Sequence, residues 1–168
     1  MDTINNVPLN SLLIPAARKG EIEVLQELIR RNADVNSRDE KGYSPLIIAC
    51  YHNQYEAAKL LLQHGADVNA ADAGGNTALM GASFKGYSEI VKLLIENGAE
   101  INLQHGNGGS ALMFATIFGR NEIVKLLLAY GADRHKRDAR GLTVLDLALQ
   151  QNNHEAVRIL QEGSNNEA

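Results

Sequence analysis

The sequence has no tryptophan, a single cysteine, three prolines and only 5% aromatic residues. A core made from this composition must consist of Leu, Ile, Val and Ala, as in closely packed helices. One cysteine, Cys50, excludes an internal disulfide and a multi-cysteine zinc site. With 168 residues, 45% of them hydrophobic, the chain is still long enough for one well-buried body.

An excess of positive charge and long apolar runs are also missing. The net charge of −4 provides no global field that favours nucleic acid or an anionic membrane. The mildly apolar stretch 7–17 is interrupted by Pro8, Asn10 and Pro15, lacks a basic region before it, and is too short to span a bilayer. We therefore expect a soluble, cytoplasmic protein that binds neither nucleic acid nor membrane.

The sequence does contain a strict internal repeat, most clearly in residues 72–104. Gly65, Gly98 and Gly131 follow one another at intervals of 33 residues, and so do Leu46, Leu79, Leu112 and Leu145. A period of this kind predicts stacked units that share one continuous core. The copies cover about 6–38, 39–71, 72–104, 105–137 and 138–163, which leaves a short tail at 164–168 that we expect to be disordered.

Each copy predicts a turn, a short helix, a second helix and a connecting loop. A Gly-containing hairpin precedes a helix-capping hydroxyl, whose oxygen accepts from free amides of the first helical turn. These hydroxyls are Ser11, Ser44, Thr77, Ser110 and Thr143. The first helix ends at a residue that tolerates a left-handed conformation, namely Gly20, Asn53, Gly86, Gly119 or Asn152.

The second helix has an apolar stripe and its own terminating residue. Ile90, Val91, Leu93 and Leu94 lie three and four residues apart, so they share one face. The expected ends of these helices are Asn32, Gly65, Gly98 and Gly131. Helices this short are marginal alone, so neighbouring copies must stabilise them.

The repeats resemble ankyrin repeats. The resemblance is carried by GNTAL at 75–79, GYSEIVKLL at 86–94 and GAEIN at 98–102, and again by GYSPL at 42–46 and GADVN at 65–69. It implies an all-α solenoid of helix-turn-helix units joined by β-hairpin or loop connections, forming a single domain over 1–168. It also implies a concave surface, made by the hairpins and first helices, that binds other proteins.

Three features depart from the family pattern. Where the family has a histidine that links adjacent hairpins, this chain has Ile47, Met80, Met113 and Asp146, so we expect apolar packing to replace that hydrogen bonding. The first and last copies deviate most, which is typical of capping repeats and of a complete domain. Asn36, Asn69 and Asn102 stand where ankyrin-like proteins can be hydroxylated; we expect hydrogen bonds within the connecting turn instead.

Candidate catalytic and metal sites are weak. Serines 44 and 110 are assigned to caps, and Cys50 occupies a slot suited to a small buried side chain. The five histidines lack metal-ligand spacing, and His105 replaces the aspartate that opens other copies. The glycines at 106–109 match the hairpin register and lack the Lys-Ser/Thr pair of a phosphate loop. We expect no enzyme and no cofactor or metal.

The candidate site is a stripe at the ends of the first helices. Tyr51, Phe84 and Ile117 are 33 residues apart, Phe118 adjoins the last, and Tyr43 extends the stripe on a hairpin. Exposed aromatic anchors with polar surroundings are typical of protein-binding hot spots. The alternative is that the rings tuck between repeats and enlarge the core.

Positive charges flank this stripe and predict a partner with an apolar centre and an acidic rim. The predicted partner-binding residues are Tyr43, Tyr51, His52, Phe84, Lys85, Ile117, Phe118, Lys41, Arg137 and Arg140. We expect a monomeric, non-enzymatic module that inhibits, protects or recruits a protein. The alternatives are a self-associating scaffold and, with less support, a small-molecule-binding protein or enzyme.

Overall fold

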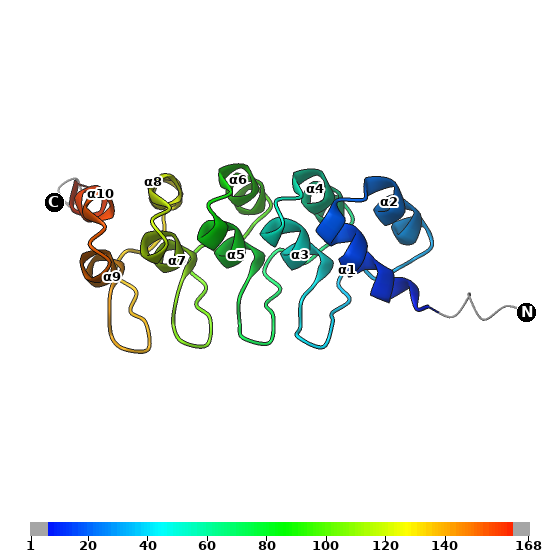
Figure 1. Cartoon of the computed structure of the whole chain (residues 1–168), viewed down its shortest axis with the longest axis horizontal. Helices are drawn as coiled ribbons and strands as arrows, with labels where there is room; N and C mark the ends of the chain where they lie inside the picture. Colours follow the sequence, from blue (N-terminus) through cyan, green and yellow to red (C-terminus); the bar gives the residue numbers. More distant parts are fainter. Residues whose placement is uncertain (1–6, 163–168) are drawn as a thin grey trace, which may run out of the picture.

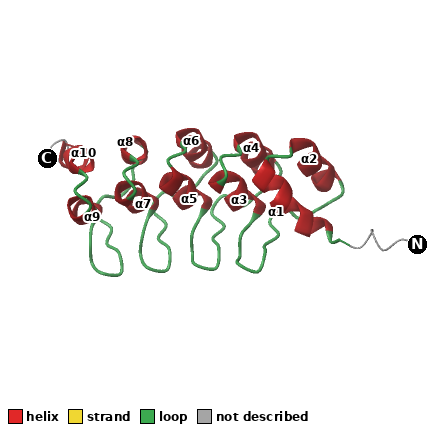
Figure 2. Cartoon of the chain, in the orientation of Figure 1, coloured by secondary structure: helices red, strands yellow, loops and turns green. Residues whose placement is uncertain are grey.

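The computed structural model describes residues 7–162 as two parallel rows of helices (Figure 1). Loops project from the row of first helices, and the described region contains no extended strand (Figure 2). The first helices are α1 (Leu9–Lys19), α3 (Pro45–Tyr51), α5 (Ala78–Lys85), α7 (Ala111–Ile117) and α9 (Val144–Gln150). The second helices are α2 (Ile22–Arg30), α4 (Tyr55–Gln63), α6 (Ser88–Glu96), α8 (Asn121–Ala129) and α10 (His154–Glu162). The expected disordered tail at 164–168 lies outside the described residues.

Side-chain caps begin four of the five first helices, as predicted. The hydroxyls of Ser44, Thr77, Ser110 and Thr143 each accept a hydrogen bond from the amide three residues later, at 3.2–3.4 Å. Ser11 was wrongly predicted to be a cap. Helix α1 already begins at Leu9, after Pro8, and the Ser11 hydroxyl instead donates to the Pro8 carbonyl at 2.7 Å.

The predicted helix ends have the backbone conformation that Gly and Asn tolerate. Asn53 and Asn152 have positive φ after α3 and α9, and Gly86 has a φ of 85° after α5. The second helices close in the same way at Asn32, Gly65, Gly98 and Gly131. The reversals after the first helices direct the chain back along its partner helix, and those after the second helices lead into the connecting loop.

One hydrophobic cluster runs through the whole solenoid, from Leu13 in α1 to Leu160 in α10. Each first helix packs on the next first helix and on its own second helix. Leu61, Leu94 and Leu127 of the second helices are fully buried. The 3.6-residue periodicity therefore places its apolar stripe in a core shared between repeats.

Backbone hydrogen bonds join adjacent hairpins. The amide of Ala73 donates to the Lys41 carbonyl at 3.0 Å, and Gly106 and Ala139 make the equivalent bonds one and two repeats later. Ile47, Met80 and Met113 are buried, as expected for apolar packing at the family's histidine position. Asp146 was not correctly predicted: its carboxylate accepts from the Thr143 amide and hydroxyl and completes a capping box.

The asparagines at 36, 69 and 102 also differ from expectation, because their bonds cross to the next repeat. Asn36 Oδ1 accepts from the Asp67 amide at 2.8 Å, and Nδ2 donates to the Gly65 carbonyl at 3.0 Å. Asn69 and Asn102 repeat the Oδ1 bond at 2.8 Å. These side chains therefore tie successive connecting turns together.

No helix within residues 7–162 is both long and apolar enough to cross a membrane.

Candidate functional site

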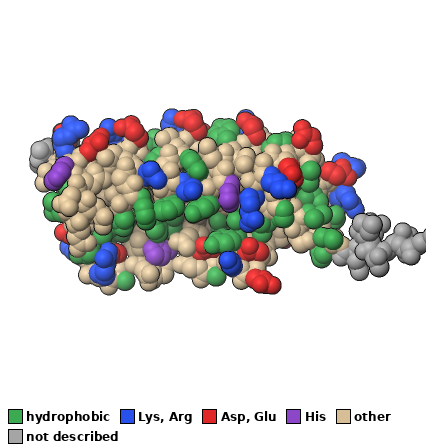
Figure 3. All heavy atoms as spheres, in the orientation of Figure 1, with side chains coloured by type: hydrophobic (Ala, Val, Ile, Leu, Met, Phe, Trp, Pro, Cys, Tyr) green, Lys and Arg blue, Asp and Glu red, His purple; other side chains and the backbone are tan. Residues whose placement is uncertain are grey.

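A row of aromatic rings crosses the face formed by the first helices. Tyr51 at the end of α3 stacks on Phe84 of α5, with centroids 6.2 Å apart and planes 7° from parallel. Phe84 meets Phe118, which follows α7, edge to face at 4.5 Å. We call Tyr51, Phe84 and Phe118 the aromatic row. A hydrophobic band follows the first helices on the surface in Figure 3.

The aromatic row lies outside the core. Tyr51 and Phe118 are 39% and 46% exposed, and Phe84 is half-buried. The core and the half-buried side chains packed on it include Ile117 and Tyr43 but none of the three rings of the row. The three rings contact one another, but part of each ring surface remains exposed to solvent.

Ile117 stands in the register of Tyr51 and Phe84, next to Phe118. Tyr51, Phe84 and Ile117 share one register, yet Phe84 contacts Phe118, one residue further on. Ile117 is half-buried and lines a second groove, with His105 and Phe114. The row thus changes register between α5 and α7.

Cations surround the Tyr51 end of the row. Lys85 Nζ lies 4.8 Å from the centroid of the Tyr51 ring, a cation–π contact. His52 meets the same ring edge to face at 5.6 Å. Partial burial, then Arg18 and Lys85, lower the pKa of His52 below its ordinary 6.5. Within residues 7–162, neither Arg18 nor Lys85 forms an ion pair, so this cluster presents uncompensated positive charge.

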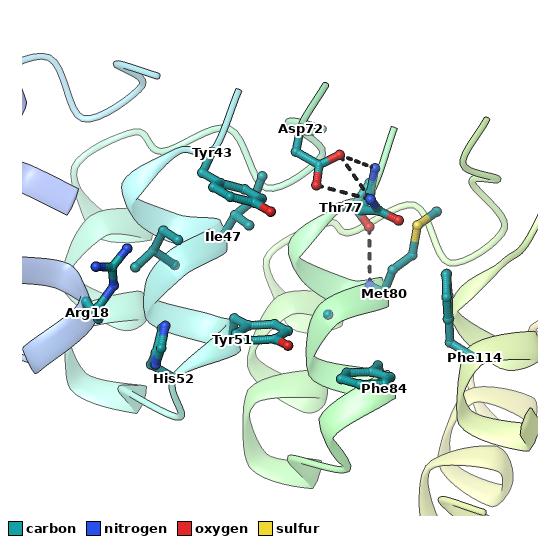
Figure 4. Close-up of a pocket in the computed structure, with 13 residues that line it drawn as sticks. Arg18, Tyr43, Ile47, Tyr51, His52, Asp72, Thr77, Met80, Phe84 and Phe114 are labelled. Atoms are coloured by element: carbon teal, nitrogen blue, oxygen red, sulfur yellow. Dashed lines mark hydrogen bonds between the residues drawn. The ribbon is translucent and has the colours of Figure 1, made fainter. Parts of the chain in front are cut away.

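A groove of about 370 Å³ runs beside the row, between α3 and α5 (Figure 4). Arg18 and His52 stand at one end, Tyr43 and Asp72 on the hairpin side, and Phe114 beyond Met80. Sequence reasoning did not identify this groove. The available signal was Gly81, which stands in the register of Ile48 and Phe114 and supplies no side chain.

The remaining predicted site residues lie on the hairpins. Lys41 is exposed on the hairpin before α3, and Arg137 and Arg140 are exposed near the hairpin before α9. Arg140 is paired with Asp138 at 2.7 Å, and Arg137 Nη1 donates to the Gly141 carbonyl at 2.7 Å. These two arginines therefore have local structural partners, unlike Arg18 and Lys85.

The other candidates for chemistry have structural roles. Cys50 is fully buried, and this burial raises the pKa of its thiol. His105 Nδ1 accepts from the Asn107 amide at 3.3 Å, as Asp72 Oδ1 accepts from Gly74 in the preceding hairpin. Across the described residues, no cluster of three His, Cys, Asp or Glu side chains could hold a metal ion.

The paired short helices, reversed at Gly or Asn and joined by bonded hairpins, define a helical repeat solenoid. A family model described as ankyrin repeats (3 copies) matches residues 13–105 and 99–168. The chain belongs to the ankyrin-repeat family. No curated protein matches the sequence significantly. Ankyrin repeats are generally protein–protein interaction modules, and ankyrin-repeat proteins are typically non-enzymatic.

Proposed function

We propose that this chain binds a protein partner through the concave face formed by its first helices and hairpins, as a small inhibitor, protector or recruiting adaptor. The observation that carries the proposal is the aromatic row, exposed on that face and bordered by unpaired cations. In this proposal the protein is a monomer in the absence of its partner and is located in the cytoplasm.

The geometry of the row suits a rigid binding surface. Tyr51, Phe84 and Phe118 hold one another through ring contacts and lie at the ends of helices supported by the core. Preorganised aromatic side chains lose little conformational entropy on binding, and such residues dominate interface energetics. The row therefore provides the apolar centre of the interface.

The positive charges beside the aromatic row indicate which residues the partner carries at the edge of the interface. Lys85 and Arg18 lie beside the row without carboxylate partners, and Lys41, Arg137 and Arg140 extend positive charge along the hairpins. An acidic rim on the partner complements this arrangement and accelerates association. Arg140 contributes least, because Asp138 already neutralises it.

A quantitative pull-down from the source cell lysate tests the proposal. The baits are the wild type, a Tyr51→Ala, Phe84→Ala, Phe118→Ala variant, and a control with Tyr55→Ala and Tyr130→Ala. Both control residues are exposed aromatics of the second-helix row. Circular dichroism first establishes that all three proteins fold equally.

A partner retained by wild type and control, and depleted about 30-fold or more by the row variant, is the expected result. Equal capture by all three baits would place binding elsewhere and contradict the proposal. Loss in the control alone would move the site to the second helices. If no partner is captured, sedimentation velocity across a dilution series tests the self-associating alternative: a dimer that the row variant abolishes would replace the proposal.

A further inference from the structure

Gly81 is an unexplained glycine in the middle of α5. Its φ is not in the left-handed region, so the backbone does not require glycine. Glycine inside a helix costs about 0.5–1 kcal/mol relative to alanine. A Cβ built at this position would meet only Tyr51 Cδ2, at 3.5 Å, which is an ordinary van der Waals contact. The fold therefore bears a cost at Gly81 that alanine would remove.

Gly81 is one of the residues that line the groove. The same register holds the bulky residues Ile48 in α3, Phe114 in α7 and Leu147 in α9. At Gly81 the surface opens into a cavity of about 370 Å³ that Ile48, Met80 and Phe84 help to line. This volume falls at the lower end of the ligand-pocket range, about 300–1,000 Å³.

One charged side chain at the edge of the groove is available to a partner. Asp72 is already satisfied, because its carboxylate accepts from the Gly74 amide and from the amide and side chain of Asn76. The Thr77 hydroxyl likewise accepts from the Met80 amide. Arg18 is exposed at one end of the groove and forms no ion pair within residues 7–162, so its guanidinium can pair with a carboxylate.

We propose that the groove over Gly81 is an anchor pocket for one bulky apolar side chain of a protein partner, presented on a segment whose nearby Asp or Glu pairs with Arg18. The inference rests on the proposed function. It specifies that the partner binds through a segment that contains a bulky apolar residue and a nearby Asp or Glu, the apolar–acidic pair. Glycine is needed because any larger side chain would occupy the pocket from within the chain.

Selection from a displayed random 16-residue peptide library tests the anchor pocket. Wild-type protein is the target, and binding of the enriched peptides is measured against Gly81→Leu, Gly81→Ala, Arg18→Gln, the aromatic-row variant, and the Tyr55→Ala, Tyr130→Ala control. Leu is chosen because Leu147 occupies the equivalent position in α9. Gly81→Ala keeps the test valid if the larger residue impairs folding.

The expected peptides share a bulky apolar residue within about one helical turn of an Asp or Glu. Gly81→Leu weakens their binding about 30-fold, the effect of losing an interface anchor. Gly81→Ala weakens it severalfold while raising the melting temperature, a combination that a purely structural glycine would not produce. Arg18→Gln weakens it severalfold and reduces the salt dependence.

The outcomes separate this inference from the proposed function. Peptides that lose binding to the row variant but bind Gly81→Leu and Gly81→Ala like wild type would overturn the anchor pocket and leave the aromatic row in place. Peptides that bind every variant equally would overturn both. Enrichment of no peptide, or of peptides lacking the apolar–acidic pair, would also overturn the pocket.

Discussion

Truncating Leu94 tests the shared core, because this residue lies at the centre of the solenoid. It is fully buried in α6, which packs on α5 and on the neighbouring second helices α4 and α8. The Leu94→Ala change removes the side-chain carbons Cγ, Cδ1 and Cδ2 with their hydrogens. At about 0.8 kcal/mol per buried group, the lost transfer free energy is about 2.4 kcal/mol.

A cavity adds to this cost. The neighbouring helices α4 and α8 are held by their packing on α3 and α7, so they cannot collapse fully into the vacated space. The free energy of unfolding should fall by about 3–4 kcal/mol, within the range of about 2–5 kcal/mol for such truncations. Because repeat solenoids couple through neighbours, a weakened middle repeat should also lower the urea m-value as the two ends separate.

The assay is a urea titration followed by far-UV circular dichroism, with two matched variants. Leu127→Ala, at the equivalent buried position in α8, should behave like Leu94→Ala. Leu149→Ala is the control, since Leu149 is 56% exposed and should lose well under 1 kcal/mol. An unchanged midpoint and slope for Leu94→Ala would refute the assignment of the second-helix stripe to the shared core.

Three further predictions concern single side chains. Cys50 should resist a thiol reagent at pH 8 until the protein is unfolded, because burial raises its pKa; rapid labelling of the native protein would contradict this. Hydrogen bonds from the Thr143 amide and, to a lesser extent, from the Thr143 hydroxyl lower the pKa of Asp146 below its ordinary 3.8. The ionised Asp146 therefore stabilises the folded protein fully above that pH, and this stabilisation is lost as the pH falls through the folded-state pKa. Asp146→Asn should therefore flatten the decline of melting temperature below about pH 4, and a parallel decline would reject the capping box. Asn69→Ala should lower the free energy of unfolding, measured by urea titration, by about 1–2 kcal/mol, because the Glu100 amide loses its bond to the Asn69 side chain across repeats. The stability of Asn69→Asp should lie between those of the wild type and Asn69→Ala. An unchanged stability of Asn69→Ala would show that water replaces the bond.

The repeat architecture was predictable because its signals are local. A hydroxyl at Ser44 or Thr77 satisfies an amide three residues away, and Gly86 or Asn53 reverses the chain within one turn. These requirements depend on neighbouring backbone groups and leave a mark in sequence at every period. The exception, Ser11, lies inside α1, because the helix already begins at Leu9, directly after Pro8.

The candidate surface was predictable only in part, because its contacts link different repeats. Residue types and period identified Tyr51, Phe84 and Ile117, with Phe118 beside the last, as an apolar stripe. The packing of one repeat on the next decided that the Phe84 ring meets the Phe118 ring edge to face. Side-chain direction likewise decided that Arg140 turns to Asp138 while Arg18 stays unpaired.

The sequence by itself determined the helices, their ends, the shared apolar face and the family, since each follows from spacing and backbone hydrogen bonding. The tertiary structure alone decided which exposed rings touch, that Asn69 bonds the next repeat, and that Gly81 lines a groove. The shape of the space beside a glycine depends on which residues surround it in the folded protein. For Gly81 those neighbours are Ile48, Tyr51 and Phe84, brought together by the packing of α3 on α5.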